Sequence, residues 1–384
     1  MPDAAPKTLV LAGGGHAHVL VLRAFGDRPE PGLRLVVVAK ELSAPYSGML
    51  PGLVAGHYEP EEVHVDLPAL AGWAGAELRH DAVTGVDAAA RLVRLASGEA
   101  LAYDLLSLDV GITPALDGIA GAAEHAVAVK PVSTFWPKWA ALADRARAPD
   151  GPRRFCVVGG GAAGFELVLA IRRRLRDDAR AAGEDPNRYA FALTAGGALL
   201  EGFNAAARRR ARRALERAEV ALIEDDPAVR VTPDAVHLRS GRAIAADAAL
   251  VTTRAAPAPW FETSALPRAP DGFLAARATL QLDGLEDVFA VGDCATSLDH
   301  PRPKAGVFAV RQGPALAETL RRAAQGAPPR PFTPQARWLS ILSTGGRSAI
   351  AARGALCVEG AWVWRWKDRI DRRFMARFRD LPAR

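Results

Sequence analysis

The sequence predicts an α/β fold with two Rossmann-like dinucleotide-binding domains, the second inserted in the first, and a small C-terminal region. Two apolar strands, 8–12 and 155–158, each run into a triple-glycine turn that is followed by a helix. Such a turn lets the backbone approach a pyrophosphate, and the helix offers free N–H groups and the positive end of its dipole. A third apolar strand ends in Gly292-Asp293. These observations predict two dinucleotide sites, one for a flavin nucleotide and one for a nicotinamide nucleotide.

The first unit begins as strand, helix and strand, and a loop rich in proline and glycine follows. Further strand-like stretches lie between turn signals before the chain changes unit. In order, the expected elements are strand 8–12, helix 16–25, strand 33–39, loop 44–52, and strands 76–79, 83–86, 91–95 and 103–110. This order predicts the first part of a discontinuous domain.

The second unit repeats that beginning. It contains strand 155–158, helix 162–181 and strand 189–194, followed by an arginine-rich helix at 204–218. Strand and turn patterns continue to residue 253, and several prolines between 257 and 270 mark a segment that returns to the first unit. The predicted domains are residues 1–115 with 271–330 for FAD, residues 116–270 for NAD(P), and residues 331–384 as a C-terminal region.

Composition excludes several classes of protein. With 384 residues and 49% hydrophobic content, the chain can bury large cores and is not disordered. A net charge of +6 favours anionic partners, but no helix-turn-helix, zinc-finger or RNA-reading motif supports nucleic-acid binding. The sequence shows no secretory signal and no apolar run long enough to span a membrane. We therefore expect a cytoplasmic protein.

The cysteines and histidines do not predict a disulfide framework or a metal site. Cys156, Cys294 and Cys357 lie far apart and form no CxxC or CxxxxC pair, so the redox dithiol of a disulfide reductase is missing. Cys294 is interpreted as a packed thiol, because no partner cysteine is placed to resolve it. His16 and His18 have no third ligand at a suitable spacing.

The first glycine turn departs from the usual fingerprint, because it reads Gly13-x-Gly15-x-x-His18. His18 stands where close packing of the helix on the strand normally requires a glycine. Two interpretations stay open. Either His16 and His18 only form the first turn of the helix, or one imidazole contacts phosphate or the loop 44–52.

Other candidates for this site follow later strands. Glu41 comes one or two residues after the usual position of a ribose-binding acid, so it is either a ribose ligand or a surface carboxylate. Pro45 and Tyr46 lie in the next loop, and Gly111 follows strand 103–110. We count all four among the residues that bind the cofactor.

Gly292-Asp293 suits the ribityl and diphosphate chain of a flavin nucleotide. The glycine allows a close approach, and the carboxylate accepts a hydrogen bond from a hydroxyl group. Gly306 and Val307, in the segment 301–314 that follows, can bring a helix N-terminus against the flavin ring, where its positive end would stabilise an anionic reduced flavin. Lys304 either adds charge at the same place or is a surface cation.

The second turn has the regular fingerprint, Gly159-x-Gly161-x-x-Gly164. Its strand ends at 194–196 in Thr-Ala-Gly, which supplies neither an acid for a ribose 2′-hydroxyl nor an arginine for a 2′-phosphate. The choice between NADH and NADPH therefore stays open. So does the alternative that this copy keeps its fold but binds nicotinamide nucleotide poorly.

The C-terminal stretch 362–380 predicts an amphipathic basic helix. Aromatic and aliphatic residues recur at four-residue intervals, namely Trp366, Ile370, Phe374 and Phe378, and six cations take other faces. The helix either docks on the protein's own surface or on a twin subunit in a homodimer, or it binds a membrane surface. In the last case the protein would lie at the inner face of the membrane.

Taken in order, the motifs PYSGMLPG, GGGAAGFE, VFAVGD, PRPKAGVFAVRQG and WKDRIDRRFM make the chain similar to a known group. It resembles the FAD-dependent pyridine nucleotide-disulfide oxidoreductase superfamily, in the branch found alone or fused ahead of selenide, water dikinase. That branch is related to type II NADH dehydrogenases and sulfide:quinone oxidoreductases.

The resemblance implies a glutathione-reductase-like pair of domains, with FAD as cofactor and NAD(P)H as co-substrate. It also implies that Glu166 lies near the nicotinamide and the flavin. Glu166 and, from its place before the Gly306 helix, Lys304 are the predicted catalytic residues. Arg254 is a departure, because the superfamily usually has a glycine after the strand 249–253.

The leading hypothesis is hydride transfer from NAD(P)H to FAD, followed by electron transfer to a quinone or another small acceptor. One alternative is a flavin-binding protein with a vestigial second site that acts as a sensor or as a partner in selenium metabolism. The other is a flavin oxidase with an organic donor.

Overall fold

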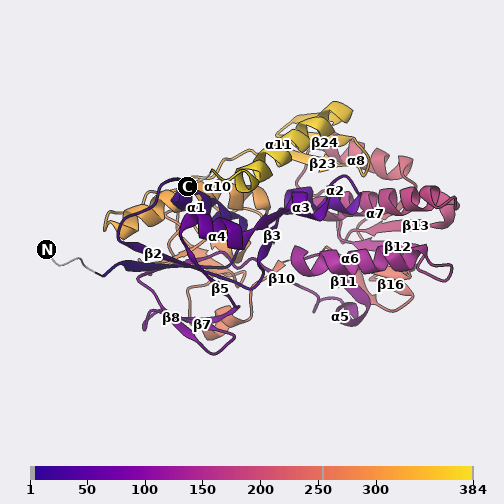
Figure 1. Ribbon diagram of the computed structural model, residues 1–384. Helices are drawn as coiled ribbons and strands as arrows, with labels where there is room; N and C mark the ends of the chain where they lie inside the picture. Colours follow the sequence, from indigo (N-terminus) through magenta and orange to yellow (C-terminus); the bar gives the residue numbers. More distant parts are fainter. Residues whose placement is uncertain (1–4, 253–254, 383–384) are drawn as a thin grey trace.

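The computed structural model describes residues 5–252 and 255–382 (Figure 1). Two parallel five-stranded sheets lie next to each other, each covered by helices, and they confirm the predicted α/β class. Arg254 lies outside the described residues. No helix in the described part of the chain has the length and apolar character that crossing a membrane requires.

The first sheet has the strand order β21-β9-β1-β2-β5, and its pairs are parallel. Its strands are β1 (Lys7–Ala12), β2 (Leu33–Ala39), β5 (Glu77–His80), β9 (Leu105–Leu108) and β21 (Val288–Ala290). Because β21 follows the whole second sheet along the chain, the second unit is inserted in the first. The boundaries of the predicted domains stay predictions.

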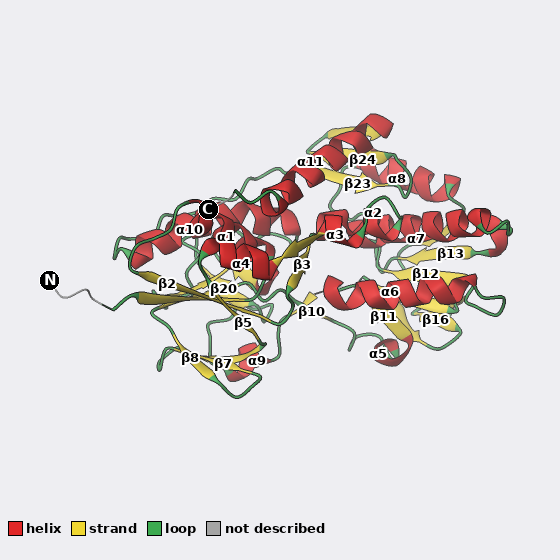
Figure 2. Cartoon of the chain, in the orientation of Figure 1, coloured by secondary structure: helices red, strands yellow, loops and turns green. Residues whose placement is uncertain are grey.

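Both faces of the first sheet are buried, which parallel sheets require. Leu9 and Leu11 face one hydrophobic cluster, and Val10 and Ala12 face another. Three helices cover the first face, and an antiparallel sheet lies on the other side (Figure 2). These elements are α1 (His16–Asp27), α4 (Leu67–Ala74) and α10 (Gly306–Ala324), and β6 (Val83–Asp87), β7 (Leu92–Leu95) and β8 (Ala100–Ala102).

The second sheet has the order β11-β18-β12-β13-β14. Its strands are β11 (Ala126–Ala128), β12 (Arg154–Val158), β13 (Ala190–Thr194), β14 (Val220–Ile223) and β18 (Ala248–Val251). Its main helices are α6 (Val132–Arg147), α7 (Ala162–Ala181) and α8 (Ala205–Arg217). A second antiparallel sheet packs nearby, formed by β15 (Ala228–Val231), β16 (Ala235–Leu238) and β17 (Ala243–Ala245).

Short elements connect these layers. Residues 44–52, expected as a loop, belong to β3 (Ser43–Pro45), a 3-10 turn (Ser47–Met49) and α2 (Leu50–Val54), because Pro51 suits a first helical turn. The other short strands are β4 (His64–Asp66), β10 (Thr113–Pro114), β19 (Ala255–Ala256), β20 (Leu274–Ala276) and β22 (Ala295–Ser297). The short helices are α3 (Pro60–Val63), α5 (Ala122–His125) and α9 (Trp260–Thr263), with 3-10 turns at Pro186–Arg188 and Gly292–Cys294.

The C-terminal region forms a small antiparallel sheet and one long helix. Its elements are β23 (Ser340–Ser343), β24 (Ala349–Arg353), β25 (Leu356–Gly360) and α11 (Ala361–Arg379). The sheet lies against α7 and α8 of the second unit, whereas α11 also contacts α3 and β4 of the first. Figure 1 shows α11, in yellow, along the side of the molecule where the two units meet.

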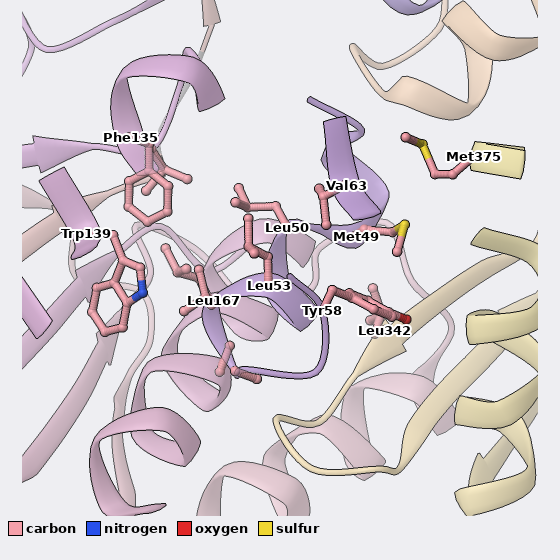
Figure 3. Packing of buried hydrophobic residues seen from close by; sticks show 14 of the residues in the cluster. Met49, Leu50, Leu53, Tyr58, Val63, Phe135, Trp139, Leu167, Leu342 and Met375 are labelled. Atoms are coloured by element: carbon pink, nitrogen blue, oxygen red, sulfur yellow. The ribbon is translucent and has the colours of Figure 1, made fainter. Parts of the chain in front are cut away.

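One hydrophobic core joins the two units and the C-terminal region. Leu53 of α2 and Trp139 of α6 belong to the same buried cluster as Leu342 of β23 and Met375 of α11 (Figure 3). Removal of this apolar surface from water stabilises the arrangement of the two sheets. The segment 43–66 is thereby held against both the second unit and α11.

Candidate active site

A cavity of about 410 Å³ opens where β1, β2 and β9 end. The carboxyl ends of parallel strands are the usual place for a ligand in such sheets. Among its lining residues are nine of those predicted to bind a cofactor, namely Gly13, Gly15, His16, Glu41, Pro45, Tyr46, Gly111, Asp293 and Gly306. The fold thus brings together segments that are almost 300 positions apart.

Asp109 is the acidic group around which the first glycine turn is built. Its Oδ2 accepts hydrogen bonds from the backbone N–H groups of Ala17, at 2.9 Å, and His18, at 3.2 Å. A Cβ on Gly15 would lie 2.2 Å from the carboxylate carbon, and one on Gly13 would lie 2.3 Å from the Asp109 carbonyl oxygen. The glycines therefore make room for this residue, and burial raises the pKa of its carboxyl group to about 7.

Sequence reasoning missed Asp109, although one signal was present. An acidic residue directly follows the apolar stretch Leu105–Leu108, whose four residues are all buried. Such a side chain needs hydrogen-bond partners or a special role. The free N–H groups of the first turn of α1 supply those partners.

His18 is a structural residue of this turn. It is fully buried, its Nδ1 lies 2.7 Å from the carbonyl oxygen of Gly13, and its Nε2 lies 2.8 Å from Ser107 Oγ. Burial lowers its pKa to about 4, so the ring is neutral. Since a carbonyl oxygen can only accept, we assign the proton to Nδ1 and the donor role to Ser107. His18 is absent from the cavity lining, and the expected cofactor contact is not supported.

His16 differs, because it faces the cavity. Its ring meets Tyr46 edge-on, with 5.6 Å between centroids, so it does contact the segment 44–52. Its Nε2 is buried and has no hydrogen-bond partner among the described residues. Burial lowers the pKa of the imidazole to about 4. A buried nitrogen of this kind is expected to bind a ligand atom.

Lys130 is the lysine that lines this cavity beside Asp293. Its Nζ donates to Asp293 Oδ2 at 2.8 Å, which joins the connection after β11 to the turn after β21. Lys304, the predicted cation, instead donates to the carbonyl oxygen of Ala295 and to Thr296 Oγ1, and its Nζ lies 3.9 Å from the centre of the Phe273 ring. It lines a small neighbouring recess.

Helix α10 begins at Gly306 with its first turn at the cavity. Gly306 and Ala309 line the cavity, whereas Val307 does not. Gly292 lines the neighbouring recess, and its N–H donates to Gln312 Oε1 at 2.8 Å. The predicted helix start is thus at the cavity, although Val307 itself is not placed for contact.

The second glycine turn packs more simply. Gly159 has φ +127°, and a Cβ on Gly164 would lie 1.8 Å from the Gly159 carbonyl oxygen. A Cβ on Gly161 would meet nothing within 4 Å, so the face above the start of α7 is open. Thr194, at the end of β13, is buried, and its hydroxyl has no partner among the described residues.

Glu166 points from the second turn of α7 toward the C-terminal region. Its Oε1 accepts from the backbone N–H of Ser343 at 2.7 Å. Loss of solvation raises its pKa to about 7, while Lys367 acts to lower this pKa and Asp371 to raise it. Glu166 does not line the cavity, so the fold places it close to α11 and not against the first glycine turn.

The predicted apolar stripe of α11 is divided between two faces. Phe378 and Met375 are buried, and the Phe374 ring lies 4.5 Å from that of Tyr46. Trp366 and Ile370 are 40% and 41% exposed. Four residues exceed one turn of 3.6, so each step rotates by about 40° and the stripe leaves the buried face.

Comparison with known proteins supplies the family. A model of the family described as pyridine nucleotide-disulphide oxidoreductase matches residues 7–313. The chain belongs to this family. Its members are NAD(P)H-dependent flavin oxidoreductases, so the predicted cofactor class and the enzyme class are confirmed.

Individual relatives of this pyridine nucleotide-disulphide oxidoreductase are distant. The chain is 24% identical over 310 residues to the demethylphylloquinone reductase NdbB of Synechocystis. The aligned region covers 78% of this chain and 74% of that protein. The fold matches the sulfide:quinone oxidoreductase of Aquifex aeolicus with TM-score 0.81, 16% identity and coverage of 98% and 92%. It matches NDH2 of Plasmodium falciparum, in complex with NADH, with TM-score 0.79, 12% identity and coverage of 96% and 97%.

Despite the name of the family, the described cysteines are not placed for disulphide chemistry. All three are free, and Cys156 and Cys294 are buried. Burial raises the pKa of each of these two thiols to about 12, so neither forms a thiolate near neutral pH.

Proposed function

We propose that the protein transfers a hydride from NAD(P)H to FAD in the cavity and passes the electrons to a quinone. The observation that carries the proposal is the convergence of the glycine turn, His16, Asp293 and the start of α10 on one cavity. The names of two relatives, a demethylphylloquinone reductase and a sulfide:quinone oxidoreductase, support a quinone as the acceptor.

The residues present fit FAD. Asp109 already accepts from Ala17 and His18 in the first turn of α1, so the N–H groups offered to an anionic cofactor are those of the glycine turn before them and of the start of α10. His16 Nε2 is a buried atom in need of a partner, and Asp293 offers a carboxylate to a hydroxyl group. When bound, FAD supplies two-electron chemistry, and the protein supplies placement and charge.

The second glycine turn would bind the nicotinamide nucleotide. Gly161 is open, and α7 begins directly behind it, which suits a pyrophosphate. Thr194 at the end of β13 offers no charge for or against a 2′-phosphate. We therefore expect the protein to accept NADH and NADPH within about tenfold of each other in kcat/KM, a difference of about 1.4 kcal/mol.

A steady-state assay in which the electron donor and the electron acceptor are varied independently tests this proposal. The FAD-loaded protein should oxidise NADH or NADPH when a soluble quinone is present, and much more slowly with oxygen alone. Rapid turnover with oxygen would instead indicate an oxidase. Absence of turnover with every quinone would reject the proposed acceptor.

We further propose that α11 rests on an anionic membrane surface, at the inner face of the membrane, from which a quinone would be drawn. The exposed face of α11 combines Trp362, Trp366 and Ile370, which are 52%, 40% and 41% exposed, with three arginines. Arg365, Arg369 and Arg373 are among the exposed arginines of α11, which also include Arg377 and Arg379. Aromatic residues mixed with arginine are typical of interfacial helices.

Vesicle co-sedimentation tests this contact. The protein should sediment with vesicles of phosphatidylglycerol and phosphatidylcholine, and substitution of Trp362, Trp366 and Ile370 by serine should abolish sedimentation. Val229→Ser, which removes another exposed apolar side chain on β15, is the matched control. Equal sedimentation of all variants would reject the contact, and a dimer lost in the triple variant would assign this face to a second copy.

A further inference from the structure

Asp109 lies in the cavity wall with one of its two oxygen atoms available to a ligand. Its side chain lines the cavity, although the residue is only 3% exposed. Oδ2 accepts from the N–H groups of Ala17 and His18, whereas Oδ1 has no hydrogen-bond partner among the described residues. An unpartnered polar atom at this depth is expected to bind a group that enters the cavity.

Two glycines from distant segments make the space for Oδ1. A Cβ on Gly15 would lie 2.3 Å from this atom, and a Cβ on Gly292 would lie 2.4 Å from it. Oδ1 is therefore held between the first glycine turn and the turn that carries Asp293. Both turns are part of the proposed FAD site, so the carboxyl group of Asp109 lies where the two meet.

No positive charge is paired with this carboxyl group. Among the described residues, no lysine, arginine or histidine forms an ion pair with Asp109, and Lys130 is paired with Asp293 Oδ2 at 2.8 Å. A buried carboxylate without a cation is unfavourable, and Asp293 adds a second negative charge nearby. These surroundings favour the neutral form of Asp109, which carries a proton.

A bound diphosphate would favour the neutral form further, because it is an anion itself. The N–H groups of Ala17 and His18, which would otherwise face such an anion, already donate to Asp109. An ionised Asp109 would therefore add repulsion at the glycine turn. A protonated Asp109 instead has one O–H donor, and Oδ1 is the atom free to carry it.

We propose that Asp109 is protonated when FAD is bound and donates its Oδ1–H to an oxygen atom of the cofactor, so that FAD binding takes up a proton from water. The only covalent bond that forms is this O–H bond, on protein molecules that have lost the proton before FAD binds. Asp109 is thus a cofactor-binding residue that couples the affinity for FAD to pH. The inference rests on the FAD site of the proposed function, and on neither NAD(P)H nor a quinone.

The direction of the pH dependence follows from the surroundings of Asp109. Burial raises the pKa of its carboxyl group to about 7, and a diphosphate beside it would raise this pKa further. Below about pH 7, Asp109 is protonated with or without FAD, and the affinity should be constant. Above about pH 7, binding requires a proton, so Kd should rise about tenfold per pH unit.

The other titratable groups near Asp109 do not account for such a change. Burial lowers the pKa of His16 and of His18 to about 4 and raises that of Cys294 to about 12, so these three keep their charge between about pH 6 and about pH 9. The groups around Asp109 are His16 and His18 on α1, Asp293 and Cys294 after β21, Lys130 after β11 and Lys304 before α10.

Dilution of the FAD-loaded protein at a series of pH values tests the proposal, with the fluorescence of released FAD as the measure of Kd. We expect Kd to rise about tenfold from about pH 6 to about pH 8, and about tenfold again to about pH 9. Asp109→Asn keeps an N–H donor in place of the O–H group. This variant should bind FAD at about pH 6 within about threefold of the wild type, lose the pH dependence, and bind more tightly than the wild type at about pH 9.

Asp104→Asn is the matched control. Asp104 directly precedes β9, whereas Asp109 directly follows it, and its Oδ2 accepts from the backbone N–H of Thr8 at 2.7 Å. It is exposed and does not line the cavity, so its substitution should leave Kd and the pH dependence unchanged. A wild-type Kd that is constant between about pH 6 and about pH 9, or a pH dependence that persists in Asp109→Asn, would overturn the proposal. Protein that binds no FAD at any pH would instead count against the proposed function.

Proton uptake by the unmodified protein gives a second test that does not depend on how the variants fold. Calorimetric titration with FAD in two buffers of different ionisation enthalpy measures the number of protons taken up. From a pKa of about 7, we expect about 0.5 proton per FAD at about pH 7 and about 0.9 at about pH 8. Binding without proton uptake at about pH 8 would contradict the proposal.

Discussion

The two glycine turns have nearly the same sequence, yet different groups surround them. At the first turn, the lack of a side chain on Gly15 leaves room for the buried carboxyl group of Asp109, and the His18 side chain donates to the Gly13 carbonyl oxygen. At the second turn, the corresponding space at Gly161 is empty, and Gly164 lets the Gly159 carbonyl oxygen approach directly. The first turn is thus fixed by the side chains of Asp109 and His18, and the second by close backbone contact and the hydroxyl group of Thr252, which donates to the Gly159 carbonyl oxygen.

This difference shows that one motif can serve packing and ligand binding in different proportions. At the first turn, Gly15 must be a glycine because a side chain there would collide with Asp109. At the second turn, no protein atom excludes a side chain at Gly161, so only a bound nucleotide would require a glycine there. Substitution by alanine should therefore disturb the protein and its FAD site at Gly15, but only nucleotide binding at Gly161.

The largest effect is expected for Gly15→Ala. Asp109 cannot move away from the new methyl group, because it is buried and held by two N–H groups. We expect FAD binding to weaken by more than about a thousandfold, or about 4 kcal/mol. Fluorescence titration of the protein with FAD measures this constant.

Gly161→Ala is the matched variant at the second turn. Its backbone angle suits alanine, and the methyl group meets no protein atom within 4 Å. FAD binding should stay within about twofold of the wild type, while KM for NAD(P)H should rise about tenfold, because the methyl group occupies space that a pyrophosphate needs. Equal loss of FAD in both variants would contradict the comparison.

The next largest expected effect is that of the ionisation of Asp109 on the free energy of unfolding. Its folded-state pKa is about 7 against an ordinary 3.8, so the folded protein holds a proton that the unfolded chain has released. Stability should therefore fall as the pH rises from about 4 to about 7, by about 1.4 kcal/mol per pH unit.

Chemical denaturation of the wild type and of Asp109→Asn, without added FAD, checks this contribution. The difference in free energy of unfolding between the two proteins should change across the window from about pH 4 to about pH 7 and become constant above it. A difference that does not depend on pH would mean that Asp109 titrates like an exposed carboxylate.

His18→Gly should have the smallest effect, although it restores the usual fingerprint. The variant loses the bonds to Gly13 and Ser107 and leaves a cavity, so we expect a loss of about 2–3 kcal/mol in stability. Thermal unfolding measures the loss. A variant as stable as the wild type would show that the helix simply settles onto the strand, as at Gly164.

The sequence predicted the fold class and nine of the residues that line the cavity, because glycine turns and buried strands are local patterns. It did not predict Asp109 or Lys130, because their roles depend on partners from distant segments. Lys130, for example, meets Asp293 only after the second unit packs beside the first.

Two other predictions differed from the structure for equally physical reasons. Lys304 was expected to add charge at the flavin ring, but its Nζ donates hydrogen bonds to the Ala295 carbonyl oxygen and to Thr296 Oγ1. The apolar stripe of α11 looked continuous at four-residue spacing, but helical rotation turns Trp366 outward and Phe378 inward.

Anaerobic titration of the FAD-loaded protein with NADH and NADPH tests the central claim most directly. If the first turn holds the flavin and the second presents the nicotinamide, the oxidised-flavin absorbance should disappear with one equivalent of reduced nucleotide. Gly161→Ala should require more nucleotide to reach the same end point. An absorbance that neither nucleotide changes, in protein that retains its FAD, would contradict the account.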